Sequence, residues 1–268
     1  MIFHKDIFQG GLALGTKLNY IILCGSLAVG AVLRVFMLLF TVNHSSGFIA
    51  HEYITPAILM IAVMVIAALL VFVSALTQKQ KALKFNFMPL VGAVISILMA
   101  VAIFCEIFAS SLLKYAPPTQ SILHKASGVL AVLALLYMAA CYFIKRDYPK
   151  VITVFPIVFW ITRVITVFTE FAALATVSDM VLETVSMCLC LFVFMDYGKL
   201  MCGLEVKSKK LTRAVATLCG YVCLLSSLPR IICALALPEA FSYFANIPPF
   251  TTLAAALFAV NFALQIEE

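Results

Sequence analysis

Long apolar runs separated by short polar breaks dominate the pattern along this chain. Eight runs stand out, near residues 18–42, 53–76, 89–113, 122–144, 151–177, 180–201, 211–237 and 248–264. Most approach or exceed the roughly 20 residues that a helix needs to cross about 30 Å of hydrocarbon. A membrane barrel would instead show alternating segments of about 10 residues. The pattern therefore predicts an all-α, polytopic transmembrane bundle of about eight helices.

The runs leave no room for a separate soluble domain, so we predict a single integral membrane domain over residues 1–268. Residues 1–16 mix apolar and polar positions, which fits a short interfacial helix or a frayed terminus equally well. Only Ser178 and Asp179 separate the fifth run from the sixth. This very tight turn favours two crossings but also fits a re-entrant segment.

Composition supports the membrane interpretation. Hydrophobic residues make up 65% of the chain and charged residues 11%, with a mean hydropathy of +1.14. A soluble domain carries roughly 25% charged residues, so water could not solvate the surface of this chain. The lipid bilayer is its expected surrounding.

Lysine and arginine are distributed unevenly between the two sets of loops. With residue 1 in the cytoplasm and eight crossings, the inner segments hold 13 of the 18 Lys and Arg residues. The outer segments hold only Lys114 and Lys125. Positive residues favour the cytoplasmic side, so we predict that both termini are cytoplasmic. The net charge of +6 then faces anionic lipid, and no nucleic-acid partner is needed to explain it.

Six charged residues stand out among the polar residues inside the apolar runs, where each costs several kcal/mol unless it is paired or faces water. They are Arg34, Glu106, Arg163, Glu170, Glu183 and Arg230. Their charges balance, and with the predicted topology they lie in the outer half of the bilayer or near its centre. We therefore predict that they meet in one polar cluster.

The fifth run shows how a helix would present such a cluster. Thr162, Arg163, Thr166, Thr169 and Glu170 fall within an arc of about 120° at 100° per residue. Three interpretations remain open. The ion pairs hold the bundle together, or the arginines hold an anionic substrate in an outer-half cavity where Glu106 or Glu170 carries a proton. In the third, the cluster is a site shared with another subunit.

The chain contains none of the common hydrolase, nucleotide-binding or zinc-protease motifs, so we predict no enzyme activity and no catalytic residues. His44, His51 and His124 are predicted near the outer surface, where with Glu52 they could bind a metal or sense pH, but unrelated loop histidines are the favoured interpretation. Eight of the nine cysteines fall within apolar runs, where cysteine acts as a small hydrophobe. Cys188 and Cys190 point about 200° apart on a helix. We therefore predict no metal site and no cofactor.

A resemblance adds a source and a location. Residues 155–160 (FPIVFW), the Arg163–Val164 pair, the Ser178–Asp179 turn leading into residues 192–199, and the Arg34 segment followed by Ser46-Gly47-Phe48 carry it. These stretches cover about a third of the chain, and they resemble an uncharacterised family of multi-pass membrane proteins from anaerobic Gram-positive bacteria. The resemblance implies a bacterial plasma membrane. It implies no activity and no catalytic residues.

Two functions follow from these observations. The first is transport or binding of a small, anionic solute through a polar cavity in the outer half of the bundle. The second is a non-catalytic membrane subunit or scaffold whose buried ion pairs are structural. In the second case lipid-facing small residues, such as Ala254, Ala255 and Ala256, would contact a membrane partner or another copy of the chain.

Overall fold

A computed structural model describes residues 21–41, 51–77, 90–109, 118–144, 149–171, 178–204, 208–236 and 249–266. These residues form eight principal helices, so the all-α prediction is confirmed. The helices are the first helix (Ile21–Thr41), α2 (Ile54–Thr77), α3 (Leu90–Ala109), α4 (Pro118–Ile144), α5 (Val154–Phe171), α6 (Ser178–Met201), α7 (Lys209–Ala236) and α8 (Pro249–Gln265). The predicted interfacial segment 1–16 lies outside the described residues.

Seven of these helices are long and apolar enough to cross a membrane. The eighth, α8, has 17 residues and is about 26 Å long at a rise of ~1.5 Å per residue. The chain is therefore a multi-pass membrane protein.

Two predicted boundaries change in a way that affects the site. Ser178 already begins α6, so the prediction of a tight turn at Ser178 and Asp179 is wrong, and residues 172–177 lie outside the described part. The fifth and sixth runs are two separate helices, each long enough to span. α4 begins at Pro118, four residues before the predicted start, because proline suits the first position of a helix.

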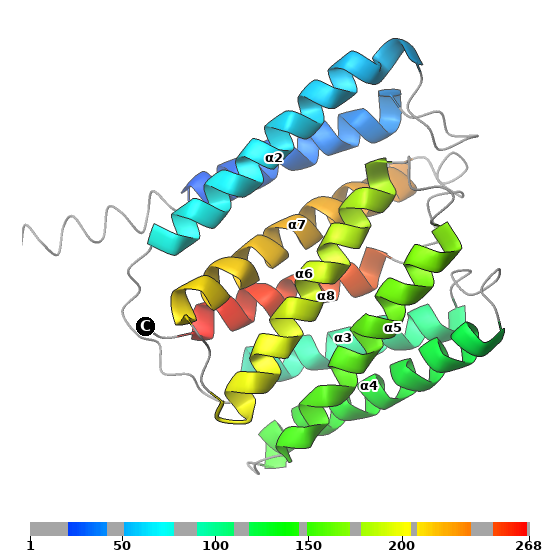
Figure 1. Ribbon diagram of the computed structural model, residues 1–268, viewed down its shortest axis with the longest axis vertical. Coiled ribbons are helices and arrows are strands. Elements are labelled where there is room, and N and C mark those ends of the chain that lie inside the picture. The colour runs from blue at the N-terminus through cyan, green and yellow to red at the C-terminus, as the bar shows by residue number, and fades with distance from the viewer. Residues whose placement is uncertain are drawn as a thin grey trace, which may run out of the picture.

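Successive helices run in alternating directions through the bundle (Figure 1). α7 packs against α6, α8 and α2, while α3 packs against α4 and α8, and α5 lies between α4 and α6. The first helix and α2 form a pair on the α7 side of the bundle (Figure 1). The described chain begins and ends on the same side (Figure 1), which we call the inner end because α2, α4, α6 and α8 end there. The opposite side is the outer end.

A continuous apolar core joins α3 to α8. This core contains a row of aromatic rings. The Phe194 ring stacks on the Phe258 ring, with their centroids 4.5 Å apart, and on the Trp160 ring, with their centroids 6.1 Å apart. A second, smaller cluster joins α2 and the first helix to α7 through Met37, Val71 and Tyr221. The bundle interior is thus closed mainly by α3 to α8.

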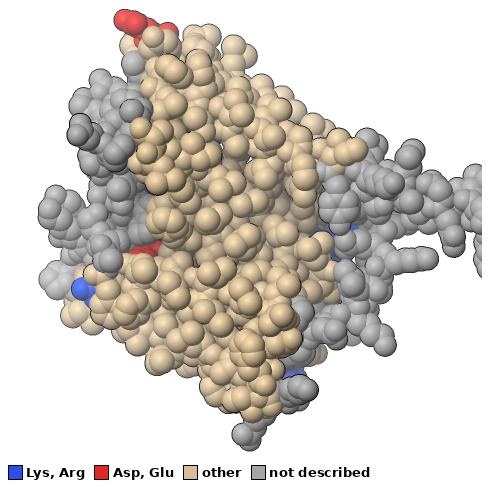
Figure 2. Space-filling model, turned by 180° about the vertical axis from the view of Figure 1, so that it is seen from behind, with Lys and Arg blue, Asp and Glu red and all other residues tan. Residues whose placement is uncertain are grey.

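The side chains exposed along the sides of the described helices are mainly apolar. Ile58, Leu59, Ile66 and Leu69 of α2 are between 57% and 64% exposed. Figure 2 shows one face that is almost uncharged, with charged residues only near its margins. Such a surface requires hydrocarbon around it, so the structure places these helices in a membrane.

The small residues assigned to a partner contact are not on this surface. Ala254, Ala255 and Ala256 are at most 6% exposed, because α8 lies inside the bundle between α3 and α7. The prediction that they face lipid is therefore wrong.

Candidate functional site

Arg163 lies at the centre of a buried network of charged side chains. α5 carries it on its inward face beside Thr162 and Thr166, and all three residues are at most 5% exposed. These positions belong to the polar stripe predicted from helical spacing. Thr162 Oγ1 lies 2.7 Å from Ser127 Oγ, which joins the stripe to α4. Thr169 is exposed and donates to Gln120 Oε1, so the stripe reaches the bundle surface there.

The Arg163 guanidinium contacts three other helices. Its Nε donates to Glu106 Oε1 of α3 at 2.8 Å, and its Nη1 donates to Glu183 Oε1 of α6 at 3.3 Å. The same Nη1 lies 3.5 Å from Thr252 Oγ1 of α8. A single side chain therefore connects α5 to α3, α6 and α8.

Glu183 is the second centre of the network, and both of its oxygens accept hydrogen bonds. Oε1 accepts from Thr252 Oγ1 at 2.6 Å. Oε2 accepts from Ser226 Oγ at 2.7 Å and from Arg230 Nη1 at 3.4 Å, both on α7. Charge-assisted hydrogen bonds of this kind are about twice as strong as neutral ones.

Two aromatic side chains complete the surroundings of Arg163. His124 of α4 is fully buried, and its Nε2 lies 3.5 Å from Glu106 Oε1. The Arg163 Cζ lies 5.1 Å from the centre of the Trp160 ring, which is within the range of a cation–π interaction. These side chains place an apolar wall and a titratable ring next to the ion pairs.

The charges in this network balance, with two arginines against two glutamates. Glu106, Arg163 and Glu183 are 0% exposed and Arg230 is 5% exposed. An isolated buried charge would cost several kcal/mol, and mutual pairing offsets that cost. Glu106 lies in the last turn of α3 and Thr252 in the first turn of α8, so the network occupies the outer half of the bundle.

Four polar nitrogens around Arg163 are buried and have no hydrogen-bond partner among the described residues. They are Arg163 Nη2, Trp160 Nε1 and the two ring nitrogens of His124, Nδ1 and Nε2. The network is therefore balanced in charge but incomplete in hydrogen bonds on the side of α4 and α5.

The structure brings four of the six predicted residues together: Glu106, Arg163, Glu183 and Arg230. Arg34 is buried on the first helix, where its Nη1 donates to Met37 Sδ at 3.9 Å. One turn earlier, Gly30 lies against Tyr221 and Leu225 of α7. Glu170 belongs to the last turn of α5, and its side chain lies outside the described part.

The sequence analysis did not assign His124, Thr252 or Ser226 to the cluster. His124 is predicted to be an unrelated histidine near the outer surface, and this is wrong because its side chain is fully buried and its Nε2 lies 3.5 Å from Glu106 Oε1. It lies in the second turn of α4, inside the predicted run 122–144. Thr252 gave no signal, because threonine is unremarkable at the end of a membrane helix.

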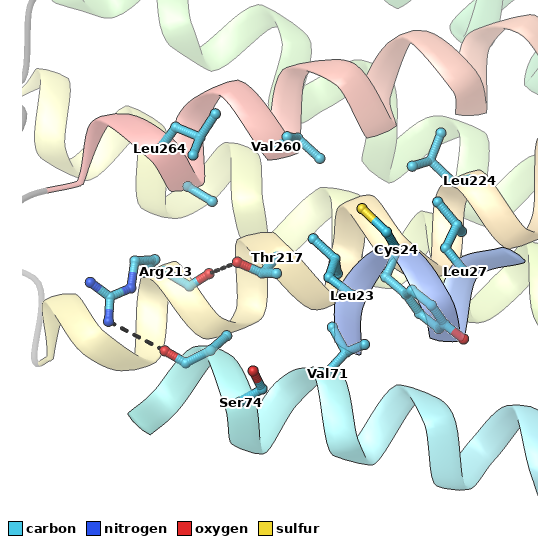
Figure 3. A pocket seen from close by; sticks show the side chains of 13 residues that line it. Leu23, Cys24, Leu27, Val71, Ser74, Arg213, Thr217, Leu224, Val260 and Leu264 are labelled. Atoms are coloured by element: carbon cyan, nitrogen blue, oxygen red, sulfur yellow. Dashed lines mark hydrogen bonds between the residues drawn. The ribbon is translucent and has the colours of Figure 1, made fainter. Parts of the chain in front are cut away.

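A cavity of about 170 Å³ lies away from this network, in the inner half of the bundle. It is lined mainly by apolar side chains, including Leu23, Leu27, Leu224 and Val260 (Figure 3). Arg213 is buried in the first turns of α7 and donates to the Ala75 carbonyl at 3.3 Å. This cavity does not coincide with the predicted outer-half polar cavity.

Comparisons with protein-family models, with curated proteins and with solved structures return no match for this chain. The resemblance to a family of anaerobic Gram-positive bacteria therefore stays a prediction.

Proposed function

We propose that this chain binds a small anionic solute at the charged network and carries it across a bacterial plasma membrane. The supporting observation is the set of four buried nitrogens without a hydrogen-bond partner at Arg163, His124 and Trp160. Each unsatisfied buried group costs about 1–3 kcal/mol. The cost is higher in a bilayer, where no water replaces the missing partner.

An oxyanion suits this set of groups. Arg163 Nη2 and Trp160 Nε1 are donors only, and His124 donates from at least one nitrogen in either protonation state. A carboxylate or phosphate oxygen accepts from such donors, and Arg163 adds a positive charge beside it. The solute would take up the donors that Glu106 and Glu183 leave unused.

The carboxylates also suggest how binding is coupled to a proton. Glu106 Oε1 accepts from Arg163 Nε and lies near His124 Nε2. A proton on Glu106 removes the negative charge that competes with an anion for Arg163. The network remains neutral when one proton and one monovalent anion enter together. This stoichiometry fits symport and requires no catalytic step.

Access to the network requires helix movement, because its members are buried. α7 contains Pro229 directly before Arg230. Proline removes one backbone hydrogen bond and permits a kink, which transporters use in their broken helices. In the proposed orientation both termini are cytoplasmic and the network opens to the outside.

The second candidate is a non-catalytic membrane subunit whose ion pairs hold the bundle together. Charge balance favours it, because two glutamates already neutralise the two arginines without any solute. Its partner would be another membrane protein or a second copy of the chain. In this case the missing hydrogen bonds at Arg163, His124 and Trp160 belong to bound water.

Thermal unfolding in detergent separates the two functions, because a ligand that binds only the folded state stabilises it. The purified protein is heated with a panel of small carboxylates, phosphates and neutral solutes at several values between about pH 5 and pH 8. We expect one anionic class to raise the melting temperature. At about 100 times its Kd, such a solute adds ~2.7 kcal/mol of stability.

Two double variants locate the effect. Glu106→Gln with Arg163→Gln removes one ion pair from the network while leaving Glu183 paired with Arg230. Asp196→Asn with Lys199→Gln removes a partly exposed ion pair of 3.0 Å near the inner end. The solute should stabilise wild type and the inner-end variant but not the network variant. No response to any solute, with a second protein copurifying in fixed ratio, would instead support the subunit function.

A further inference from the structure

Three cysteine thiols meet inside the bundle, two helical turns inward from Glu183. Cys190 of α6 faces Cys219 and Cys223 of α7, and all three residues are at most 1% exposed. The Sγ atoms of Cys190 and Cys223 are 3.4 Å apart, those of Cys190 and Cys219 are 3.7 Å apart, and those of Cys219 and Cys223 are 3.8 Å apart. The three sulfurs therefore form a nearly equilateral triangle.

Helical spacing produces this arrangement. Cys219 and Cys223 are four residues apart and share one face of α7. Cys190 reaches them from α6, whereas Cys188 lies on another face and is only partly buried. The predicted divergence of Cys188 and Cys190 is confirmed, but the prediction of no metal site compared only cysteines close in sequence. It could not anticipate three thiols from two helices.

We propose that Cys190, Cys219 and Cys223 form a binding site for one thiophilic metal ion, either Cu(I) or Zn²⁺. Thiolate ligands select these ions over Mg²⁺ or Ca²⁺. The centre of the sulfur triangle lies about 2.1 Å from each sulfur, as the three separations above require. A zinc–sulfur bond of about 2.3 Å places the ion about 1 Å out of the sulfur plane, as on one face of a tetrahedron.

Ion binding balances as an exchange of protons for metal. Each thiol gives up its proton as its sulfur bonds to the ion, so a full set of three bonds releases three protons. Zn²⁺ with three thiolates carries one negative charge, and Cu(I) with three carries two.

If the three cysteines serve only to pack the helices, they should bind no metal ion. A cysteine inside a helix bundle is usually a small hydrophobe, and three protonated thiols in contact would need no ion. In that case the reduced protein retains no metal after removal of excess, and substitution by alanine changes only packing. The two accounts therefore differ in a quantity that can be measured directly.

The test uses the full chain, purified in detergent under reducing conditions and supplied separately with Cu(I) and with Zn²⁺. Excess ion is removed with a competing chelator, and retained metal is measured by elemental mass spectrometry. We expect one equivalent of metal in wild type and none in Cys190→Ala/Cys219→Ala/Cys223→Ala. The matched control Cys24→Ala/Cys105→Ala/Cys188→Ala removes three thiols outside the triangle and should retain the metal.

Retention of Cu(I) alone assigns a three-coordinate site, whereas retention of Zn²⁺ assigns a tetrahedral site completed by a further ligand. Cd²⁺ adds a spectroscopic readout, because thiolate coordination produces an ultraviolet charge-transfer band that the alanine variant should lack. If the triple variant does not fold, Cys190→Ser tests the same bond with nearly unchanged volume and should also lose the metal. The proposal is overturned if reduced wild type retains neither ion, or if the control loses metal as completely as the triangle variant.

Discussion

At the scale of single residues, the stability of the network depends on pairing every charge. Arg163 donates to two carboxylates, and Glu183 accepts from Arg163, Arg230, Ser226 and Thr252. Removing one member leaves its partners charged and buried, which costs more than the pair itself contributes. Single and paired substitutions should therefore have opposite consequences.

We predict that Arg163→Gln lowers the free energy of unfolding by about 3–5 kcal/mol, because Glu106 loses its arginine and Glu183 retains only Arg230. Adding Glu106→Gln should restore much of that loss, since both members of the pair are then neutral amides. Denaturation of the three proteins in mixed detergent micelles measures the difference. A single variant as stable as wild type would show that Arg163 is not held by these carboxylates.

The charged residues of the site could be predicted from sequence, while their partners could not. Arg163 and Glu183 stand out because charges are rare in apolar runs. Thr252 and Ser226 do not, since hydroxyl residues are common in membrane helices and bond to their own backbone. Arg34 follows the same charge rule as Arg163. Its surroundings, however, depend on where the first helix packs, which no local pattern encodes.

At the scale of elements, α7 is the most enclosed of the seven helices that are long enough to cross a membrane. In an apolar stretch of 18 residues of α7, 61% of residues are buried, compared with 17% in such a stretch of α2. Close approach of α7 to α8 depends on Gly220, where an added Cβ would lie 2.6 Å from Val260 Cγ2 and 3.5 Å from the Ala256 carbonyl oxygen. Small residues commonly allow membrane helices to approach in this way.

We predict that Gly220→Ala destabilises the bundle by about 1–3 kcal/mol through overpacking. Val260 cannot easily turn aside, because a β-branched side chain in a helix strongly prefers one rotamer. Gly25→Ala is the matched control, since an added Cβ there meets nothing within 4 Å. Thermal unfolding in detergent should show a lower melting temperature for the first variant only. Equal melting temperatures would contradict the close α7–α8 contact.

Hydropathy predicted that these helices exist, but the residues at which they begin and end depend on local sequence, such as a proline at the first position of a helix. The predicted run 211–237 and the observed α7 differ by two residues at one end and one at the other. α4 differs by four residues at its start, because Pro118 and the polar residues after it extend the helix beyond the apolar run. His124 lies within the predicted run, but hydropathy does not indicate that its side chain faces inward beside Glu106.

At the scale of the whole molecule, the bundle divides into a pair and a group of six. The first helix and α2 pack on α7 through Met37, Val71 and Tyr221, while the larger apolar core joins α3 to α8. The Arg163 network connects α3, α5, α6, α7 and α8, so it lies wholly in the group of six. Hydropathy predicted eight segments but not which of them would meet.

The orientation of the whole molecule in the membrane is predicted by the positive-inside rule, and chemical labelling can test it. Cys202 is exposed just beyond the inner end of α6, and His51 is exposed just before α2 at the outer end. In intact cells a membrane-impermeant maleimide should leave Cys202 unmodified until the membrane is permeabilised. In a Cys202→Ser background, His51→Cys should react without permeabilisation. The reverse result for both positions would invert the bundle, and the proposed anion site would then open toward the cytoplasm.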